Sequence, residues 1–154
     1  MDKSRLEASM HLIRLVYYSK PAALGDADIE DILTKSCANN YLKNVTGALF
    51  LNGEWFVQIL EGGRQAVSEL FVTIATDPRH SAVCLLEVSV IDERAFADWD
   101  MRYISGGPEQ EAIIKRFMPE GFDPRIVADG VRMTRVLKAL ADAGAPRPGH
   151  PAQA

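Results

Sequence analysis

The sequence has little of what marks secreted, membrane-embedded or polyanion-binding proteins. Its 154 residues contain 2 cysteines, Cys37 and Cys84, in apolar patterns without metal-ligand spacing, so we expect buried free thiols. No segment has the apolar length of a secretory signal or of a membrane span. Lys and Arg number 17 against 21 Asp and Glu, which leaves no basic surface for nucleic acids or anionic membranes. We therefore expect a cytoplasmic protein that binds neither.

Catalytic motifs are missing as well. The chain has no G-x-S-x-G, no P-loop, no H-E-x-x-H and no dinucleotide fingerprint, although flavin-binding proteins do not require the last of these. Covalent catalysis has no evident pair of nucleophile and base. These absences argue against an enzyme.

The sequence does contain enough apolar material for one globular domain, with 47% hydrophobic and 25% charged residues. Alternation over residues 11–18 predicts a first strand. After the cap signal Gly25-Asp26, apolar residues at helical spacing predict a first helix. Residues 45–51 and 54–60 flank Asn52-Gly53, a strong hairpin signal, and should form the second and third strands.

A second helix and two more strands follow the hairpin. Apolar residues at helical spacing run from Val67 to Ile74, and the pattern stops at Asp77-Pro78. Residues 83–91 and the segment around 99–104 have the character of strands. This order predicts an α+β fold with a ferredoxin-like β-α-β-β-α-β core and an additional strand. We expect a five-stranded mixed sheet with its first and third strands central and two helices on one face.

Two further helices are expected after Gly106-Gly107. The first begins at Pro108 and runs through Phe117, and the second is amphipathic. Because a sheet with apolar residues on both faces needs cover on both, we predict that they pack on the other face or form a dimer contact. The apolar positions of the second helix are Val127, Val131, Val136, Leu137 and Leu140. The predicted boundaries are a flexible N-terminus (1–9), a core domain (10–105), a helical extension (106–143) and a disordered tail (144–154).

One amide interrupts an otherwise apolar strand. Alternation places Gln58 on the same face of its strand as Phe56 and Leu60, and Tyr17 on the same face of the first strand as Leu15. A buried carboxamide or phenol must find a hydrogen-bond partner. A Tyr17–Gln58 pair would satisfy both groups, either as a purely structural contact or as part of a ligand site.

Other polar side chains have both structural and functional interpretations. Asn39 and Asn40 fall near the expected end of the first helix, where asparagine commonly forms a left-handed C-cap. Arg79 and His80 follow a helix stop and suit a solvated turn, although an arginine there can also donate to a carbonyl or a phosphate.

The fifth strand and two glycine junctions have similar double interpretations. Trp99, Met101 and Tyr103 would share one face of the fifth strand, as ordinary core or as the wall of a cofactor site. Thr46-Gly47 and Glu61-Gly62-Gly63 suit backbone requirements at strand and helix junctions.

Six short segments, taken together and in this order, closely resemble the BLUF family of blue-light sensors using FAD. They are LVYYS, ANN, VTGALF, WFVQILEG, DPRH and FADWDMRY, and they span about residues 10–105. The C-terminal helices resemble the extension of short, single-domain members of that family. The resemblance implies noncovalently bound FAD, with its ring between the first two helices and above the face of Tyr17 and Gln58.

The resemblance also implies roles for individual residues. Tyr17 matches the photoactive tyrosine, and Gln58 the amide that links it to the flavin. Light would move an electron and a proton from Tyr17 by way of Gln58 and back, leaving Gln58 rearranged by rotation or tautomerism. Further cofactor contacts are implied for Asn39, Asn40, Arg79 and His80, and a signal relay for Met101 and Trp99, which exchange places among family members.

Signalling implies a partner that distinguishes the two states. By family analogy we expect a separate protein, such as a cyclic-nucleotide enzyme or a response regulator, and a homodimer or higher homo-oligomer. Two alternatives remain open. One is a flavin- or small-ligand-binding regulatory domain without photochemistry. The other is an acylphosphatase-like hydrolase, whose Gly-rich phosphate loop this chain lacks.

Overall fold

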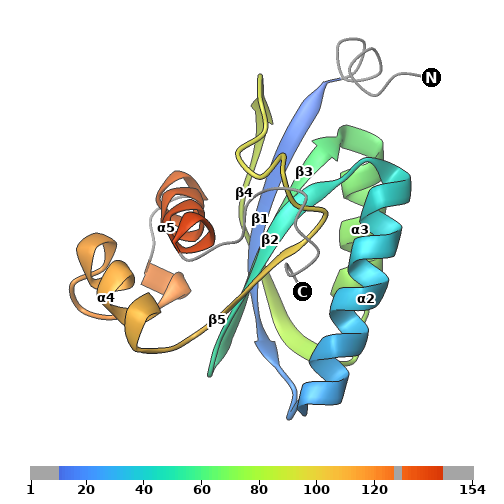
Figure 1. The fold of residues 1–154 in the computed structure, drawn as a ribbon. Coiled ribbons are helices and arrows are strands. Elements are labelled where there is room, and N and C mark those ends of the chain that lie inside the picture. Colours follow the sequence, from blue (N-terminus) through green and yellow to red (C-terminus); the bar gives the residue numbers. More distant parts are fainter. Residues whose placement is uncertain (1–10, 127–129, 144–154) are drawn as a thin grey trace.

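A five-stranded mixed sheet forms the centre of the fold, which the computed structural model describes for residues 11–126 and 130–143 (Figure 1). The strand order is β4-β1-β3-β2-β5, so the first and third strands are inner strands, as predicted. The β2–β5 pair is parallel and the other pairs are antiparallel. The strands are β1 (Leu12–Pro21), β2 (Thr46–Asn52), β3 (Trp55–Gly63), β4 (His80–Ile91) and β5 (Arg102–Ser105).

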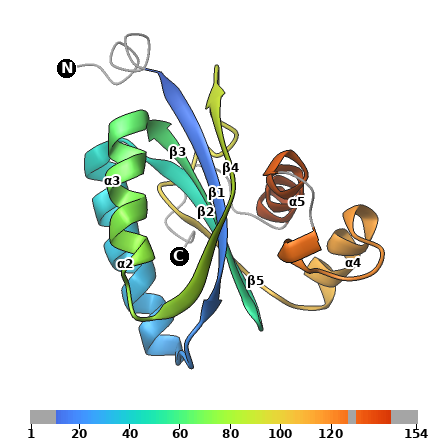
Figure 2. The same cartoon turned by 180° about the vertical axis from the view of Figure 1, so that it is seen from behind.

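Helices lie on both sides of this sheet. Helices α2 (Asp26–Lys43) and α3 (Arg64–Ala75) lie along one face, and α5 (Gly130–Asp142) lies against the other (Figures 1 and 2). Helix α4 (Pro108–Phe117) packs on α5. A short 3-10 turn, η1 (Pro124–Ile126), lies between these two helices in the chain. Of the two positions expected for the C-terminal helices, the structure has the opposite face of the sheet.

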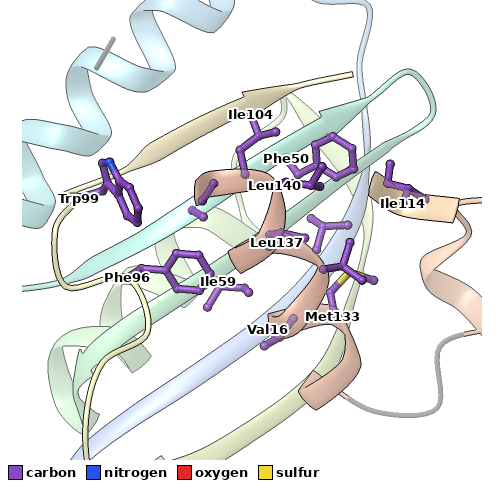
Figure 3. Close-up of a cluster of buried hydrophobic side chains, with 14 of the residues drawn as sticks. Val16, Phe50, Ile59, Phe96, Trp99, Ile104, Ile114, Met133, Leu137 and Leu140 are labelled. Carbon is purple, nitrogen blue, oxygen red and sulfur yellow. The ribbon is translucent and has the colours of Figure 1, made fainter. Parts of the chain in front are cut away.

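Two apolar layers result, one on each face. The layer under α5 takes its side chains from the sheet and both C-terminal helices, as Figure 3 shows for Val16, Ile59 and Leu137. The layer under α2 and α3 contains Tyr17 and Phe56. The alternation expected for β1 and β3 is therefore confirmed, because each strand contributes to both layers.

Two glycines are required by the β2–β3 hairpin. Asn52 pairs with Trp55, so the loop is Gly53-Glu54, one position later than predicted, and Gly53 has a φ of 52°. At Gly47 a Cβ atom would lie 2.0 Å from the carbonyl oxygen of Ile59. The first glycine permits the turn, and the second permits two strands to approach.

Two predictions about α2 and the cysteines are wrong. Helix α2 continues past Asn39 and Asn40 to Lys43, and Asn44 forms the left-handed C-cap with a φ of 55°. Cys37 is half-buried and Cys84 is exposed. Cys84 lies on β4, an edge strand with one neighbour, so an apolar sequence pattern there does not guarantee cover.

Some predictions fall outside the described residues or concern solvent-exposed positions. The flexible N-terminus (1–9), the disordered tail (144–154) and Val127 lie outside the described ranges. Val131 lies in the first turn of α5, which begins at Gly130, but its side chain is exposed rather than part of the apolar face. In the described part of the chain, no helix combines the length and the hydrophobicity needed to cross a bilayer.

Candidate functional site

A cavity of about 240 Å³ lies between the sheet and the helices α2 and α3. Its floor comes from β1, β2 and β3, and its walls come from the two helices and the turn before β4. The lining combines apolar surfaces with polar groups, the usual composition of a small-molecule site. The site residues that line it are Tyr17, Asn39, Asn40, Gln58, Arg79 and His80.

Helix α2 packs loosely on the sheet at this cavity. Among its 18 residues the one buried side chain is Asn40, whereas Ile32, Leu33 and Cys37 are half-buried. Helices in globular proteins are normally held by an apolar stripe that is covered by the core. Here α2 instead borders the cavity and places the Asn40 amide in its lining. This arrangement favours a bound group between the helix and the sheet.

Tyr17 and Gln58 meet on the cavity floor. The two residues are direct partners in the antiparallel β1–β3 pair, and the Tyr17 hydroxyl donates a hydrogen bond to Gln58 Oε1. Both side chains are buried. Burial, and secondly the negative charge of Asp77, raise the pKa of the Tyr17 phenol far above its ordinary range. Burial thus favours the protonated phenol, which is the form that donates to the amide oxygen.

The other end of the Gln58 amide faces the segment that precedes β5. Its Nε2 contacts Met101 Sδ at 3.7 Å, and a thioether is a weak acceptor. Nearby, Asn40 Nδ2 donates to the carbonyl oxygen of Asp100 at 2.8 Å. The residues around Met101 are thus joined to two polar side chains of the cavity.

Arg79 and His80 are held at the cavity wall by defined partners. Arg79 Nη2 lies 2.7 Å from Asp77 Oδ2, and its Nη1 lies 3.3 Å from Asp31 Oδ2. The hydrogen bonds from Arg79 hold the pKa of the Asp77 carboxyl below its usual value. His80 Nδ1 lies 2.7 Å from Ser19 Oγ, and its Nε2 contacts the carbonyl oxygen of Ile74. Arg79 does lie in the predicted turn, but it is paired with two carboxylates, and His80 begins β4 with both ring nitrogens in contact with the protein.

Trp99 does not share a face with Met101 and Tyr103, so that prediction is wrong. Its indole lies in the apolar layer under α5, whereas Met101 and Tyr103 belong to the layer under α2 and α3. Strand β5 begins only at Arg102, and residues 97–101 form a turn and a bend. Because alternation applies to extended backbone, it does not extend back to Trp99.

Several lining residues were missed from the sequence. Lys35 and Ser36 join Ile32, Asn39 and Asn40 on the wall formed by α2. Their spacing of three and four residues along the helix was the available signal. Asp77 has only the sequence signal of a helix stop. Ser19, which contacts His80 from outside the lining, has no signal of its own.

The residues that line the cavity suit a flavin. Leu49, Phe56 and Ile74 provide apolar surface for the faces of a ring. Gln58 and Asn40 carry amide groups, which can pair with a polar ring edge. Within the described ranges, no group of three or more His, Cys, Asp or Glu side chains could hold a metal ion.

Comparison with known families shows to which family this chain belongs. Residues 12–102 match the family model for BLUF, sensors of blue light using FAD. The chain belongs to the BLUF family. A BLUF domain is a sensor module and is not itself catalytic, which agrees with the missing catalytic motifs. Both the family assignment and the ferredoxin-like α+β fold are confirmed.

Solved structures and curated sequences give the same family. The chain is 28% identical to BlsA in its photo-activated state, with a TM-score of 0.78 and coverage of 88% of this chain and 99% of that chain. It is 34% identical to the dark state of the BLUF protein BlrB, with a TM-score of 0.72, over 84% of this chain and 97% of BlrB.

The curated relatives are much longer proteins. Photoactivated adenylate cyclase subunit alpha from Euglena gracilis is 37% identical over 86 residues, which are 55% of this chain and 8% of that protein. The blue light- and temperature-regulated antirepressor of Escherichia coli K12 is 34% identical over 68 residues, or 44% of this chain and 17% of that protein. This chain therefore spans a small part of these relatives.

Proposed function

We propose that this protein is a blue-light photoreceptor that binds FAD noncovalently in the cavity under α2 and α3. The observation that supports the proposal most is the buried hydrogen bond from Tyr17 to Gln58 on the cavity floor, with the other end of the amide on Met101. Bound FAD would supply the absorption of blue light and, once excited, a strong oxidant.

The cavity residues have distinct roles in holding this cofactor. Asn40 and Gln58 would pair with the polar edge of the ring, and Leu49 and Phe56 would support its apolar surface. Asn39 and His80 line the walls of the same cavity and would add polar contacts to the cofactor. Lys35 and Arg79, both of which pair with Asp31, are the cationic side chains of the lining that would contact the anionic phosphates of the cofactor.

Tyr17 and Gln58 carry out the photochemical step. With the excited flavin as electron acceptor, Tyr17 would give up an electron together with its phenolic proton. The proton would pass along the existing hydrogen bond to Gln58, and both would then return to Tyr17. What persists is a rearranged Gln58 amide, reached by rotation or by tautomerism. Since a buried amide must keep its donors and acceptors paired, its neighbours must also adjust. Met101, 3.7 Å from the Gln58 nitrogen, is the first of these.

The rearranged state signals only if another protein binds the two states differently. We propose a separate effector, such as a cyclic-nucleotide enzyme or a response regulator, and self-association of the photoreceptor in the cytoplasm. The apolar face of α5 is already buried on the sheet, so these contacts use other surfaces.

An absorption spectrum of the purified, FAD-reconstituted protein before and after blue light tests the proposal. We expect a bound flavin spectrum, a shift to the red on illumination and full reversal in the dark. A protein that remains colourless after reconstitution refutes flavin binding. Bound flavin without a reversible shift favours the alternative of a ligand-binding regulatory domain without photochemistry.

A further inference from the structure

A fully buried carboxylate lies outside the cavity and has no role in the steps above. Glu61 is three residues after Gln58 on β3, and its side chain has no exposed surface. Arg14 on β1 donates to Glu61 Oε2 through Nε and Nη2, each at 2.7 Å. A buried carboxylate requires such a partner, but this pair alone would join only two strands that are already neighbours.

The same carboxylate also holds the connection between β4 and β5. The backbone N–H of Ala95 donates to Glu61 Oε2 at 3.0 Å, and that of Phe96 donates to Oε1 at 2.7 Å. Each carboxylate oxygen therefore accepts a backbone donor from residues more than thirty positions away in the chain. This arrangement places the loop on the end of β3 with charge-assisted hydrogen bonds.

Arg94 fastens the loop a second time. Its Nη1 donates to Thr46 Oγ1 at 2.8 Å and to the carbonyl oxygen of Glu61 at 3.0 Å, and its Nη2 donates to the carbonyl oxygen of Asn44 at 2.8 Å. The planar guanidinium reaches three acceptors at once, which an ammonium group cannot reproduce. The start of the loop is thus fixed to β2, β3 and the residue that caps α2.

The loop held in this way links the two layers. Beyond Phe96, the carbonyl oxygen of Trp99 accepts from the Gly47 N–H at 3.2 Å, and Met101 contacts Gln58. Phe96 and Trp99 lie on the α5 face of the sheet, as Figure 3 shows. Lys138 of α5 lies 5.1 Å from the centre of the Trp99 ring. Residues 94–101 therefore contact Gln58 of the cavity floor through Met101 and α5 through Trp99.

We propose that Glu61 is a positioning residue for signal transmission. It clasps residues 94–101 so that a rearrangement of Gln58 moves Met101, Trp99 and α5 together. Without the clasp the same rearrangement is absorbed by a loose loop. The inference rests on the proposed photoreceptor function, but the clasp itself can be tested in the dark.

Glu61→Gln is the informative substitution because it keeps the size of the side chain and changes its hydrogen bonding. The acid presents two acceptor oxygens to Arg14, Ala95 and Phe96. The amide presents one oxygen and one donor nitrogen. Whichever way it turns, a donor meets a donor, and at least one loop contact is lost.

Hydrogen exchange followed by mass spectrometry, in the dark and under blue light, tests the proposal on the FAD-reconstituted full chain. In the dark, we expect Glu61→Gln to speed exchange over residues 94–101 by about tenfold. Under light, it should retain bound flavin and the red shift, while the light-minus-dark difference at α5 falls by about threefold or more. Glu69→Gln, an exposed acid-to-amide change on α3, should leave both quantities at their wild-type values.

Arg94→Lys provides a second variant if Glu61→Gln fails to fold. It keeps the positive charge and loses the forked contacts to Thr46 and Asn44, so the same changes are expected. Unchanged dark exchange over residues 94–101 in both variants overturns the clasp. If the light-minus-dark difference in hydrogen exchange at α5 is not reduced in these variants, Glu61 has no role in signal transmission. A residue with a purely structural role would change stability without changing this difference. No red shift in the wild type would refute the proposed function, while the dark measurement still decides on the clasp.

Discussion

Trp99 and Met101 are two positions apart in the chain but lie on opposite faces of the sheet. Met101 contacts the Gln58 amide under α2 and α3, whereas Trp99 packs beside Phe96 under α5, with ring centroids 6.5 Å apart. The turn and bend at residues 97–101 make this possible. A short segment therefore contacts the candidate cofactor site and the C-terminal helices at the same time.

Tyr17→Phe is expected to abolish the light-induced red shift and to leave flavin binding in place. The substitution removes the phenolic donor to Gln58 but retains the ring that packs against Phe71, with centroids 5.5 Å apart. Absorption spectra before and after illumination measure both properties. Tyr18→Phe is the matched control, because Tyr18 packs on Trp55 on the other face. A normal red shift in Tyr17→Phe would show that another group is photoactive.

The free energy of unfolding should show the energetic coupling between Tyr17 and Gln58 without the use of light. Gln58→Leu leaves the buried Tyr17 hydroxyl without its acceptor and is expected to lower stability by about 1–3 kcal/mol. Adding Tyr17→Phe removes the unpaired donor, so the double variant should recover most of that loss. Urea unfolding of the apoprotein for the wild type and the three variants measures this cycle. Strictly additive effects would contradict an energetic coupling between the two side chains.

Stability should depend on the ionisation of Asp77. Hydrogen bonds from Arg79 lower the pKa of the folded Asp77 carboxyl below its usual value of 3.8. Because the pKa is lower in the folded state, the ionised Asp77 stabilises the protein at pH values above its pKa in the unfolded chain. This contribution is lost as the pH falls through the pKa of the folded state. Asp77→Asn should therefore be less stable than the wild type at neutral pH. The two should converge as the pH falls below about 3.8.

Thermal or urea unfolding from pH 7 down into this acid range measures the difference between the two proteins. Asp123→Asn is a useful comparison, because Asp123 forms the same kind of contact with Arg125, which is more exposed than Arg79. Its effect should be smaller, since solvent screens exposed ion pairs. A stability difference between Asp77→Asn and wild type that is independent of pH would contradict the assignment to this ion pair.

Gly47→Ala is expected to be strongly destabilising. The added methyl group would lie 2.0 Å from the Ile59 carbonyl oxygen, which belongs to the backbone of an inner strand and cannot turn away. A loss of about 3 kcal/mol or more, or failure to fold, is the expected outcome. Gly53→Ala is the control: it meets no atom within 4 Å but has a φ of 52°, so it should lose only about 1–2 kcal/mol. Equal losses in the two variants would show that close strand approach at Gly47 is unimportant.

Local backbone geometry allowed much of the site to be predicted. Alternation in an extended chain places Tyr17 and Gln58 each among the apolar residues of its own strand, and the need for a buried hydrogen-bond partner suggests the pair. The structure shows them as direct partners across β1 and β3. Glycine and proline marked the hairpin and the start of α4 in the same way. The family segments added Asn39, Asn40, Arg79 and His80, all of which line the cavity.

Contacts between distant residues decided the rest. Whether Cys84 is covered depends on the neighbours of β4, and the face reached by Trp99 depends on the bend before β5. The Glu61 clasp joins residues more than thirty positions apart, which no local pattern encodes. The sequence by itself determined the order of the elements and, within extended strands, which side chains share a face, because backbone sterics act between near neighbours. Only the tertiary structure decided what covers each face, because burial depends on which segments meet in space.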